Sequence, residues 1–98
     1  MNSAFETVYA KLERIGKGTF GKVYRCRRRS DGAFFAVKEI DIENESILHQ
    51  VLKEITIMEK TQDSPYMIKY IQHFEMKDTI LIVMELADDG NLYEYLLK

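Results

Sequence analysis

The sequence predicts an α+β fold in which a five-stranded antiparallel sheet packs with one long helix. Several short runs alternate apolar and polar residues and are rich in β-branched and aromatic side chains, which is typical of strands. One stretch, residues 47–58, instead repeats its apolar residues at helical spacing. The chain has 98 residues, of which 46% are hydrophobic and 31% charged, so we expect a single small globular domain.

The first three predicted strands are Tyr9–Ile15, Val23–Arg27 and Ala33–Ile40, each with alternating character. Ser30-Asp31-Gly32 is a turn signal between the second and the third. Because the connections are short, we expect these strands to form an antiparallel meander.

The predicted helix follows the third strand. Asn44 is placed to cap it, and Glu43 and Glu45 lie near its start, where the helix dipole favours negative charge. Asp63-Ser64-Pro65 is expected to end it. Its apolar stripe consists of Ile47, Leu48, Val51, Leu52, Ile55 and Met58.

Two further strands are predicted around Ile68–Phe74 and Thr79–Glu85, with residues 76–78 as the turn between them. Residues 88–90, Asp-Asp-Gly, read as a loop, and residues 91–97 as the beginning of a second helix. The predicted order is therefore three strands, a helix, two strands and a helix start.

Charge is unevenly distributed along the chain. The net charge is −2, but residues 1–40 hold nine basic and four acidic residues, whereas residues 41–98 hold five and twelve. The two parts are therefore +5 and −7. The basic part contains a cluster of glycines, as a polyanion site would prefer. The arginines within it are interpreted as a solvated strand and turn: Arg25, Arg27, Arg28 and Arg29.

The sequence also limits the compartment. No apolar run approaches the ~18 residues of a membrane span, and the N-terminus lacks the pattern of a signal peptide. Cys26 is the sole cysteine, so no internal disulfide is possible, and we interpret it as a strand residue. We expect a cytoplasmic or nuclear protein, with no membrane or nucleic-acid partner.

The glycine cluster runs Gly16-Lys17-Gly18-Thr19-Phe20-Gly21-Lys22-Val23. A triphosphatase P-loop needs Ser or Thr where Val23 stands. A dinucleotide fingerprint needs a helix after the last glycine, and although Asp41 lies at the right distance, a strand pattern follows. A hairpin loop that covers phosphates remains, with Val23 over a base and Phe20 excluding water. An ordinary glycine-rich hairpin without a ligand is the alternative.

With Ala36-Val37-Lys38 on the next strand, this cluster resembles the glycine-rich loop and third strand of eukaryotic protein kinases. The resemblance extends from about Tyr9 to Lys98, but only over the small, ATP-binding lobe. It implies an N-terminal extension in residues 1–8, the lobe in 9–86, and the hinge with the start of the larger lobe in 87–98.

The resemblance also assigns site residues. Lys38 would contact the α- and β-phosphates and pair with Glu54 on the long helix, with Glu59 as the alternative. Met84 would be the gatekeeper behind the adenine. The full set of nucleotide-binding residues implied is Ile15, Gly16, Lys17, Gly18, Thr19, Phe20, Gly21, Lys22, Val23, Ala36, Lys38, Met84, Glu85 and Ala87.

Individual roles follow from the same match. Val23 and Ala36 would sandwich the base, while the backbone of Glu85 and Ala87 would bond its edge. Asn91 takes a position near the ribose where many relatives carry an acidic residue. Met58 and Tyr70 match the apolar spine between helix and sheet, although core packing explains them equally well. His49 and His73 have no second ligand at metal spacing and are interpreted as ordinary helix and strand residues.

By this resemblance the chain is part of a serine/threonine kinase that transfers the γ-phosphate of ATP to protein. The sequence contains no His-Arg-Asp or Asp-Phe-Gly, so the Mg²⁺ ligands are expected outside it, and we expect no transfer by this polypeptide alone. Protein substrate would bind through the other lobe, and the isolated lobe is expected to self-associate. The helix region and the stretch from residue 63 to 69 resemble monopolar-spindle kinases and, less closely, NIMA-related kinases. A non-catalytic binding module is the alternative.

Overall fold

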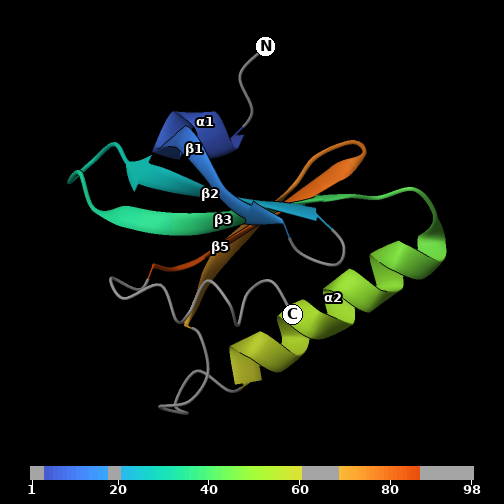
Figure 1. Ribbon diagram of the computed structural model, residues 1–98. Coiled ribbons are helices and arrows are strands. Elements are labelled where there is room, and N and C mark those ends of the chain that lie inside the picture. Colours follow the sequence, from blue (N-terminus) through green and yellow to red (C-terminus); the bar gives the residue numbers. More distant parts are fainter. Residues whose placement is uncertain (1–3, 18–20, 61–68, 87–98) are drawn as a thin grey trace.

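The computed structural model describes residues 4–17, 21–60 and 69–86. In this part of the chain, seven elements follow one another (Figure 1). They are α1 (Ala4–Val8), β1 (Tyr9–Lys17), β2 (Gly21–Arg28), β3 (Phe34–Asp41), α2 (Glu45–Lys60), β4 (Tyr70–Glu75) and β5 (Thr79–Glu85).

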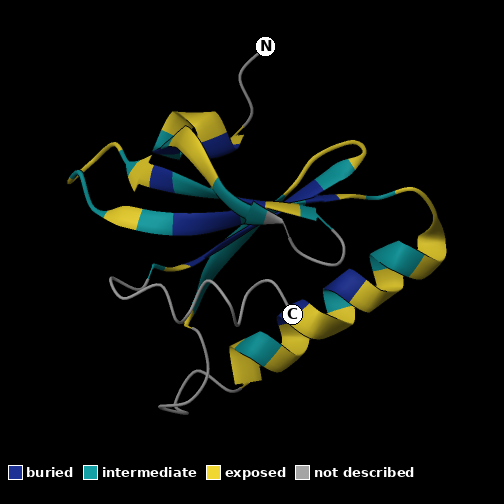
Figure 2. Ribbon diagram, in the orientation of Figure 1, coloured by how far each residue is buried: buried dark blue, intermediate teal, exposed yellow. Residues whose placement is uncertain are grey.

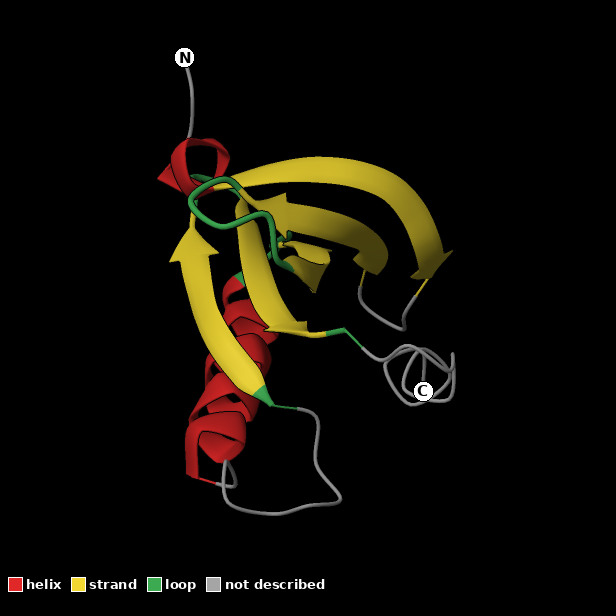
Figure 3. Ribbon diagram, turned by 90° about the vertical axis from the view of Figure 1, so that its left-hand side faces the viewer, coloured by secondary structure: helices red, strands yellow, loops and turns green. Residues whose placement is uncertain are grey.

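The five strands form one antiparallel sheet in the order β1-β2-β3-β5-β4. The first three are a meander, as predicted from the short turns. The chain then passes through α2 before it returns as the β4–β5 hairpin beside β3. β1 and β4 are consequently the two edge strands. The sheet is strongly curled, with α2 running along one side and α1 at its upper end (Figure 3).

Alternating side chains form a separate apolar cluster on each side of the sheet. The inner cluster, between the sheet and α2, contains Val23, Ala36, Ile40, Val51, Ile55, Ile80, Ile82 and Met84. The outer cluster, beneath α1, contains Phe5, Tyr9, Cys26, Val37, Leu81 and Val83. Figure 2 shows the buried positions along β2 and β3 and on the side of α2 that faces the sheet.

Local signals explain the ends of these elements. The backbone N–H of Ile47 donates to Asn44 Oδ1 at 3.0 Å, so Asn44 caps α2 as predicted. Gly32 adopts a φ of 76°, and its N–H donates to the Arg28 carbonyl at 2.8 Å, which closes the predicted turn between β2 and β3. The sheet and the long helix of the α+β prediction are confirmed.

One described element was not predicted. Residues 1–8 are predicted only as an N-terminal extension, whereas Ala4–Val8 is helical and places Phe5, only 2% exposed, against the sheet. Three predictions fall at least partly outside the described residues. They are the helix end at residues 63–65, the strand start at Ile68 and the helix start at 91–97. The domain limits stay a prediction.

Candidate nucleotide-binding site

The strand register brings the predicted site residues of three strands to one face of the sheet. Val23 on β2 lies opposite Lys38 on β3, and Ala36 lies opposite Met84 on β5. Since Ala36 and Lys38 are two residues apart, their side chains point to the same side. This is the face that also packs against α2.

Three of these residues are buried in that face. Val23, Ala36 and Met84 are each at most 2% exposed, and Ile15 packs against the same cluster from β1. The inner face therefore combines an apolar surface with the ammonium group of Lys38, which is half-buried beside it.

The acidic residues near Lys38 do not form the ion pair that the sequence predicts. Glu39 points to the outer face and pairs with Lys11 at 3.4 Å. Glu54 and Glu59, the predicted partners, are both exposed on α2. Among the described residues, no ion pair joins Lys38 to a carboxylate. The structure thus does not contain the Lys38–Glu54 pair, and the roles assigned to these residues stay predictions.

The glycine-rich segment joins β1 and β2, and the residues on either side of its centre are paired across these two strands. Gly16 lies opposite Val23, and Lys17 lies opposite Lys22. Gly18, Thr19 and Phe20, the predicted phosphate-covering residues between them, lie outside the described residues. A register shift between Arg14 and Gly16 marks an irregularity in the strand just before the hairpin.

Gly21 has a structural reason to be glycine that the sequence did not reveal. A Cβ atom built on Gly21 would lie 1.9 Å from the backbone carbonyl oxygen of Glu39 on β3. No side chain fits at that distance. The last glycine of the motif is therefore required for β2 to approach β3, independently of any ligand.

The predicted hinge begins at the end of β5. The backbone N–H of Glu85 donates to the Lys69 carbonyl at 2.9 Å, so this donor is already used within the protein. This leaves the carbonyl oxygen of Glu85 for the predicted contact with the edge of a base, and that contact stays a prediction. The other predicted hinge residue, Ala87, and the predicted ribose neighbour, Asn91, lie outside the described residues.

The two predicted spine residues, Met58 and Tyr70, both pack against the inner cluster. Tyr70 is also part of a polar chain on β4. Its hydroxyl lies 2.7 Å from His73 Nδ1, and His73 Nε2 lies 3.3 Å from a carboxylate oxygen of Glu75. Burial, with Glu59 nearby, raises the pKa of Tyr70. His73 is predicted to be an ordinary strand residue because it has no second ligand at metal spacing. The register shift between Tyr70 and Gln72, close to these contacts, leaves no local signal in the sequence.

Two further predictions concern metal and thiol chemistry. Within residues 4–17, 21–60 and 69–86, no three His, Cys, Asp or Glu side chains are grouped as a metal site would require. Cys26 is a fully buried strand residue, and burial raises the pKa of its thiol to about 12. Neither α1 nor α2 is long and apolar enough to cross a membrane.

Comparison with known proteins identifies the class. A family model described as "Protein kinase domain" matches residues 9–98, and the chain therefore belongs to the protein kinase family. Its sheet and helix match the small lobe of that domain. The twitchin kinase fragment of C. elegans, described as an autoregulated protein kinase with immunoglobulin domains, superposes with a TM-score of 0.79 at 29% identity, over 95% of this chain and 20% of that one.

Curated relatives at higher identity are also kinases. The chain is 40% identical over 91 residues to NUAK family SNF1-like kinase 1 of Homo sapiens, and equally to the protein of that name from Mus musculus. These alignments cover 90% of this chain but 14% of each relative. The chain thus spans about a seventh of the length of the curated relatives that it matches.

Proposed function

We propose that this chain is the ATP-binding lobe of a serine/threonine protein kinase, whose activity is transfer of the γ-phosphate of ATP to protein. Membership of the protein kinase family and the similarity to a named kinase support the class. The observation that carries the proposal is the inner face, where the strand register places Val23, Ala36, Lys38 and Met84 together.

The geometry of this face suits a nucleotide. Val23 and Ala36 offer small apolar side chains on which a flat base can lie. Lys38 is two residues further along β3, which is about 7 Å in a strand, so its flexible side chain extends from the base toward phosphates. The carbonyl oxygen of Glu85 would accept from the amino group of adenine at the other end.

The pairing of Lys38 with Glu54 is part of this proposal. In an α-helix, Glu54 lies about 60° around the axis from Val51 and about 100° from Ile55, the two residues that α2 buries. Glu54 is therefore on the flank of the packed side of α2. A rotation of α2 about its axis would turn the carboxylate of Glu54 toward Lys38, and bound phosphates would favour the ordered lysine that this pair holds.

Magnesium does not fit the described residues, which contain no group of ligands for it. Phosphoryl transfer depends on positioning and charge neutralisation by groups that the sequence lacks, and we propose that a second lobe supplies them and binds the protein substrate.

Binding of ATP tests the proposal. The chain should bind ATP in isothermal titration calorimetry, and Lys38→Met should weaken binding by about tenfold or more. Lys53→Met removes the same charge from the exposed side of α2 and should leave the affinity unchanged. An affinity that both variants change equally would contradict the assigned site. Purified chain with ATP, Mg²⁺ and a generic protein substrate should show no transfer above buffer, and measurable transfer would contradict the need for a second lobe.

The proposal also includes the kinase subfamily, the location in the cell and the association state of the chain. A relationship to monopolar-spindle or NIMA-related kinases rests on the helix region and residues 63–69, whereas the two curated relatives at 40% identity are named NUAK family SNF1-like kinase 1. A cytoplasmic or nuclear location and self-association of the isolated lobe are also proposed. Sedimentation that shows only monomer would contradict self-association. An absence of any ATP binding by the wild-type chain would favour the non-catalytic binding module instead.

A further inference from the structure

The outer face of the sheet is closed by aromatic rings from both ends of the described chain. Phe5 of α1 stacks on Tyr9 of β1, with ring centroids 5.3 Å apart and planes 19° apart. Phe74 of β4 meets both rings edge to face, at 5.6 Å and 6.2 Å. Phe5 is 2% and Tyr9 0% exposed. These rings contribute both buried area and specific geometry.

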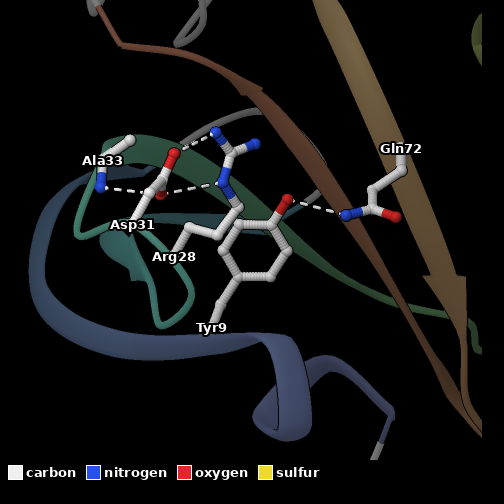
Figure 4. A network of polar contacts seen from close by, with 5 residues as sticks. All are labelled: Tyr9, Arg28, Asp31, Ala33 and Gln72. Atoms are coloured by element: carbon white, nitrogen blue, oxygen red, sulfur yellow. Dashed lines mark hydrogen bonds and ion pairs between the residues drawn. The ribbon is translucent and has the colours of Figure 1, made fainter.

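This contact joins the two edges of the sheet. β1 and β4 stand at opposite ends of the strand order and share no ladder of backbone hydrogen bonds. The side chain of Gln72 on β4 nevertheless donates to the hydroxyl of Tyr9 on β1 at 2.7 Å. Figure 4 shows the Tyr9 hydroxyl directed at Gln72, with Arg28 beside the ring. The curl of the sheet brings β1 and β4 close enough for side-chain contact, and the contacts of Phe5, Tyr9, Gln72 and Phe74 connect the two strands.

Backbone contacts hold α1 in the same place. The N–H of Arg29, in the turn after β2, donates to the carbonyl of Val8 at 2.8 Å. The Nε of Arg29 donates to the carbonyl of Glu6, also at 2.8 Å. Carbonyls at the end of a helix lack partners within that helix. Arg29 satisfies two of them and fixes α1 to the sheet.

We propose that residues 4–9 form a clasp that joins the edge strands across the outer face and fixes the origin of β1, the strand that leads into the glycine-rich loop. Phe5, Tyr9 and Gln72 are then positioning residues for the nucleotide site. The effect on nucleotide binding rests on the proposed function, whereas the clasp itself does not. The family match begins at residue 9 and leaves α1 outside it.

β1 needs such an anchor because its pairing with β2 is irregular. The register shifts twice, between Lys11 and Arg14 and again between Arg14 and Gly16. Irregular pairing weakens the ladder over the half of β1 nearest the loop. As β1 is an edge strand, it has a neighbour in the sheet on one side only. The clasp supplies a second attachment at the opposite end of the strand.

Cys26 provides a probe for opening of the clasp, since its thiol is buried in the same outer cluster. A disulfide reagent such as DTNB reacts with the thiolate only when the cluster opens. In the full chain at low urea, where opening of the outer cluster precedes global unfolding, Phe5→Ala should accelerate labelling of Cys26 by about tenfold or more with little dependence on urea. Ile55→Ala, a comparable truncation in the inner cluster, should accelerate labelling only with the steep urea dependence of global unfolding.

A milder variant keeps the test decisive if Phe5→Ala does not fold. Tyr9→Phe removes only the hydroxyl and should accelerate labelling by about threefold to tenfold, because a single hydrogen bond is lost. Gln72→Leu should act similarly, and the double variant should add little to either single change. If the effects of Tyr9→Phe and Gln72→Leu on the labelling rate add in the double variant, the clasp is overturned. It is also overturned if labelling of Phe5→Ala depends on urea as steeply as labelling of Ile55→Ala.

Nucleotide binding tests the positioning role separately. Variants that open the clasp should weaken ATP affinity by about threefold or more, since the competent conformation is then less populated. Amide hydrogen exchange should show lost protection in β1 and retained protection in α2. Opening of the clasp with unchanged ATP affinity would overturn the positioning role. If the wild-type chain binds no ATP, the proposed function fails, and the Cys26 labelling still decides whether the clasp exists.

Discussion

The two faces of the sheet treat their polar groups differently. On the outer face, Lys11 pairs with Glu39 and lies over the Tyr24 ring at 4.5 Å, and the Tyr9 hydroxyl has a hydrogen bond from Gln72. On the inner face, Lys38 is half-buried with no described carboxylate partner. An anionic ligand such as a phosphate would supply the partner that this ammonium lacks among the described carboxylates. Both faces hold apolar clusters that stabilise the sheet, and the contrast between Lys11 and Lys38 marks the inner face as the one that we propose for nucleotide binding.

The largest expected effect is on the outer face. Phe5→Ala removes a ring that is 2% exposed and should lower the free energy of unfolding by about 3–5 kcal/mol. Phe34→Ala is the matched control, because its ring is 47% exposed and is covered on one side only by Arg25, at 4.7 Å. We expect it to cost about 1 kcal/mol or less. Urea unfolding of both variants measures the difference. Equal losses in the free energy of unfolding would contradict a stabilising role of the outer cluster.

The next largest effect separates structure from ligand binding within the glycine-rich motif. Gly21→Ala places a Cβ against the Glu39 carbonyl and should cost about 1–3 kcal/mol, whether or not nucleotide is present. The loss should appear in thermal unfolding without ATP. An alanine at Gly21 that changes only ATP affinity would show that β2 and β3 separate easily, contrary to the geometry.

Substitution of Lys38 should affect ligand binding without lowering the stability of the fold, in contrast to substitution of Gly21. Lys38→Met retains most of the apolar stem but removes an ammonium that no described carboxylate neutralises, so unfolding stability should stay equal or rise by up to about 1 kcal/mol. Lys11→Met on the outer face breaks the pair with Glu39 and the contact with Tyr24, and stability should fall slightly. Thermal unfolding of both variants tests this contrast. A clear loss for Lys38→Met would mean that the inner face is satisfied without ligand.

Most of the fold was predictable because each element has its own period. The apolar spacing in α2 and the alternation in β2 and β3 are local signals, and the structure confirms them. α1 was missed since one buried aromatic residue in a five-residue helix makes no period. The burial of Phe5 depends on Tyr9 and Phe74, which only the folded sheet brings near.

The candidate site, like the fold, was predictable from the sequence only in part. Alternation along a strand is enough to place Ala36 and Lys38 on one face, and antiparallel pairing adds Met84. The direction of Glu54 was not predictable, because the rotation of α2 is set by how Val51 and Ile55 pack against the sheet. The structural reason for Gly21 likewise lies in a neighbouring backbone and not in the motif.

The smallest expected effect concerns acid sensitivity of the outer face. Arg28 forms two hydrogen bonds to the Asp31 carboxylate, at 3.0 and 2.6 Å, and Asp31 also accepts from the Ala33 N–H. The Arg28 bonds are the main cause that lowers the pKa of Asp31 from 3.8 to about 2. Because the folded pKa lies below the unfolded one, this stabilisation is fully present above the unfolded pKa and is lost as pH falls from about 4 to about 2.

Asp31→Asn should therefore lower stability slightly at neutral pH and flatten its decline over this acid range, and urea unfolding at a series of pH values measures both. Asp41→Asn is the control, because it removes the same charge from the exposed end of β3, where the described residues form no ion pair with it. The pair is exposed, so salt should reduce its contribution. Since Arg28 also covers the Phe35 ring at 4.8 Å, protonation of Asp31 would loosen the outer face before the inner one. An unchanged acid slope in Asp31→Asn would place the acid-sensitive groups elsewhere and remove this distinction between the faces.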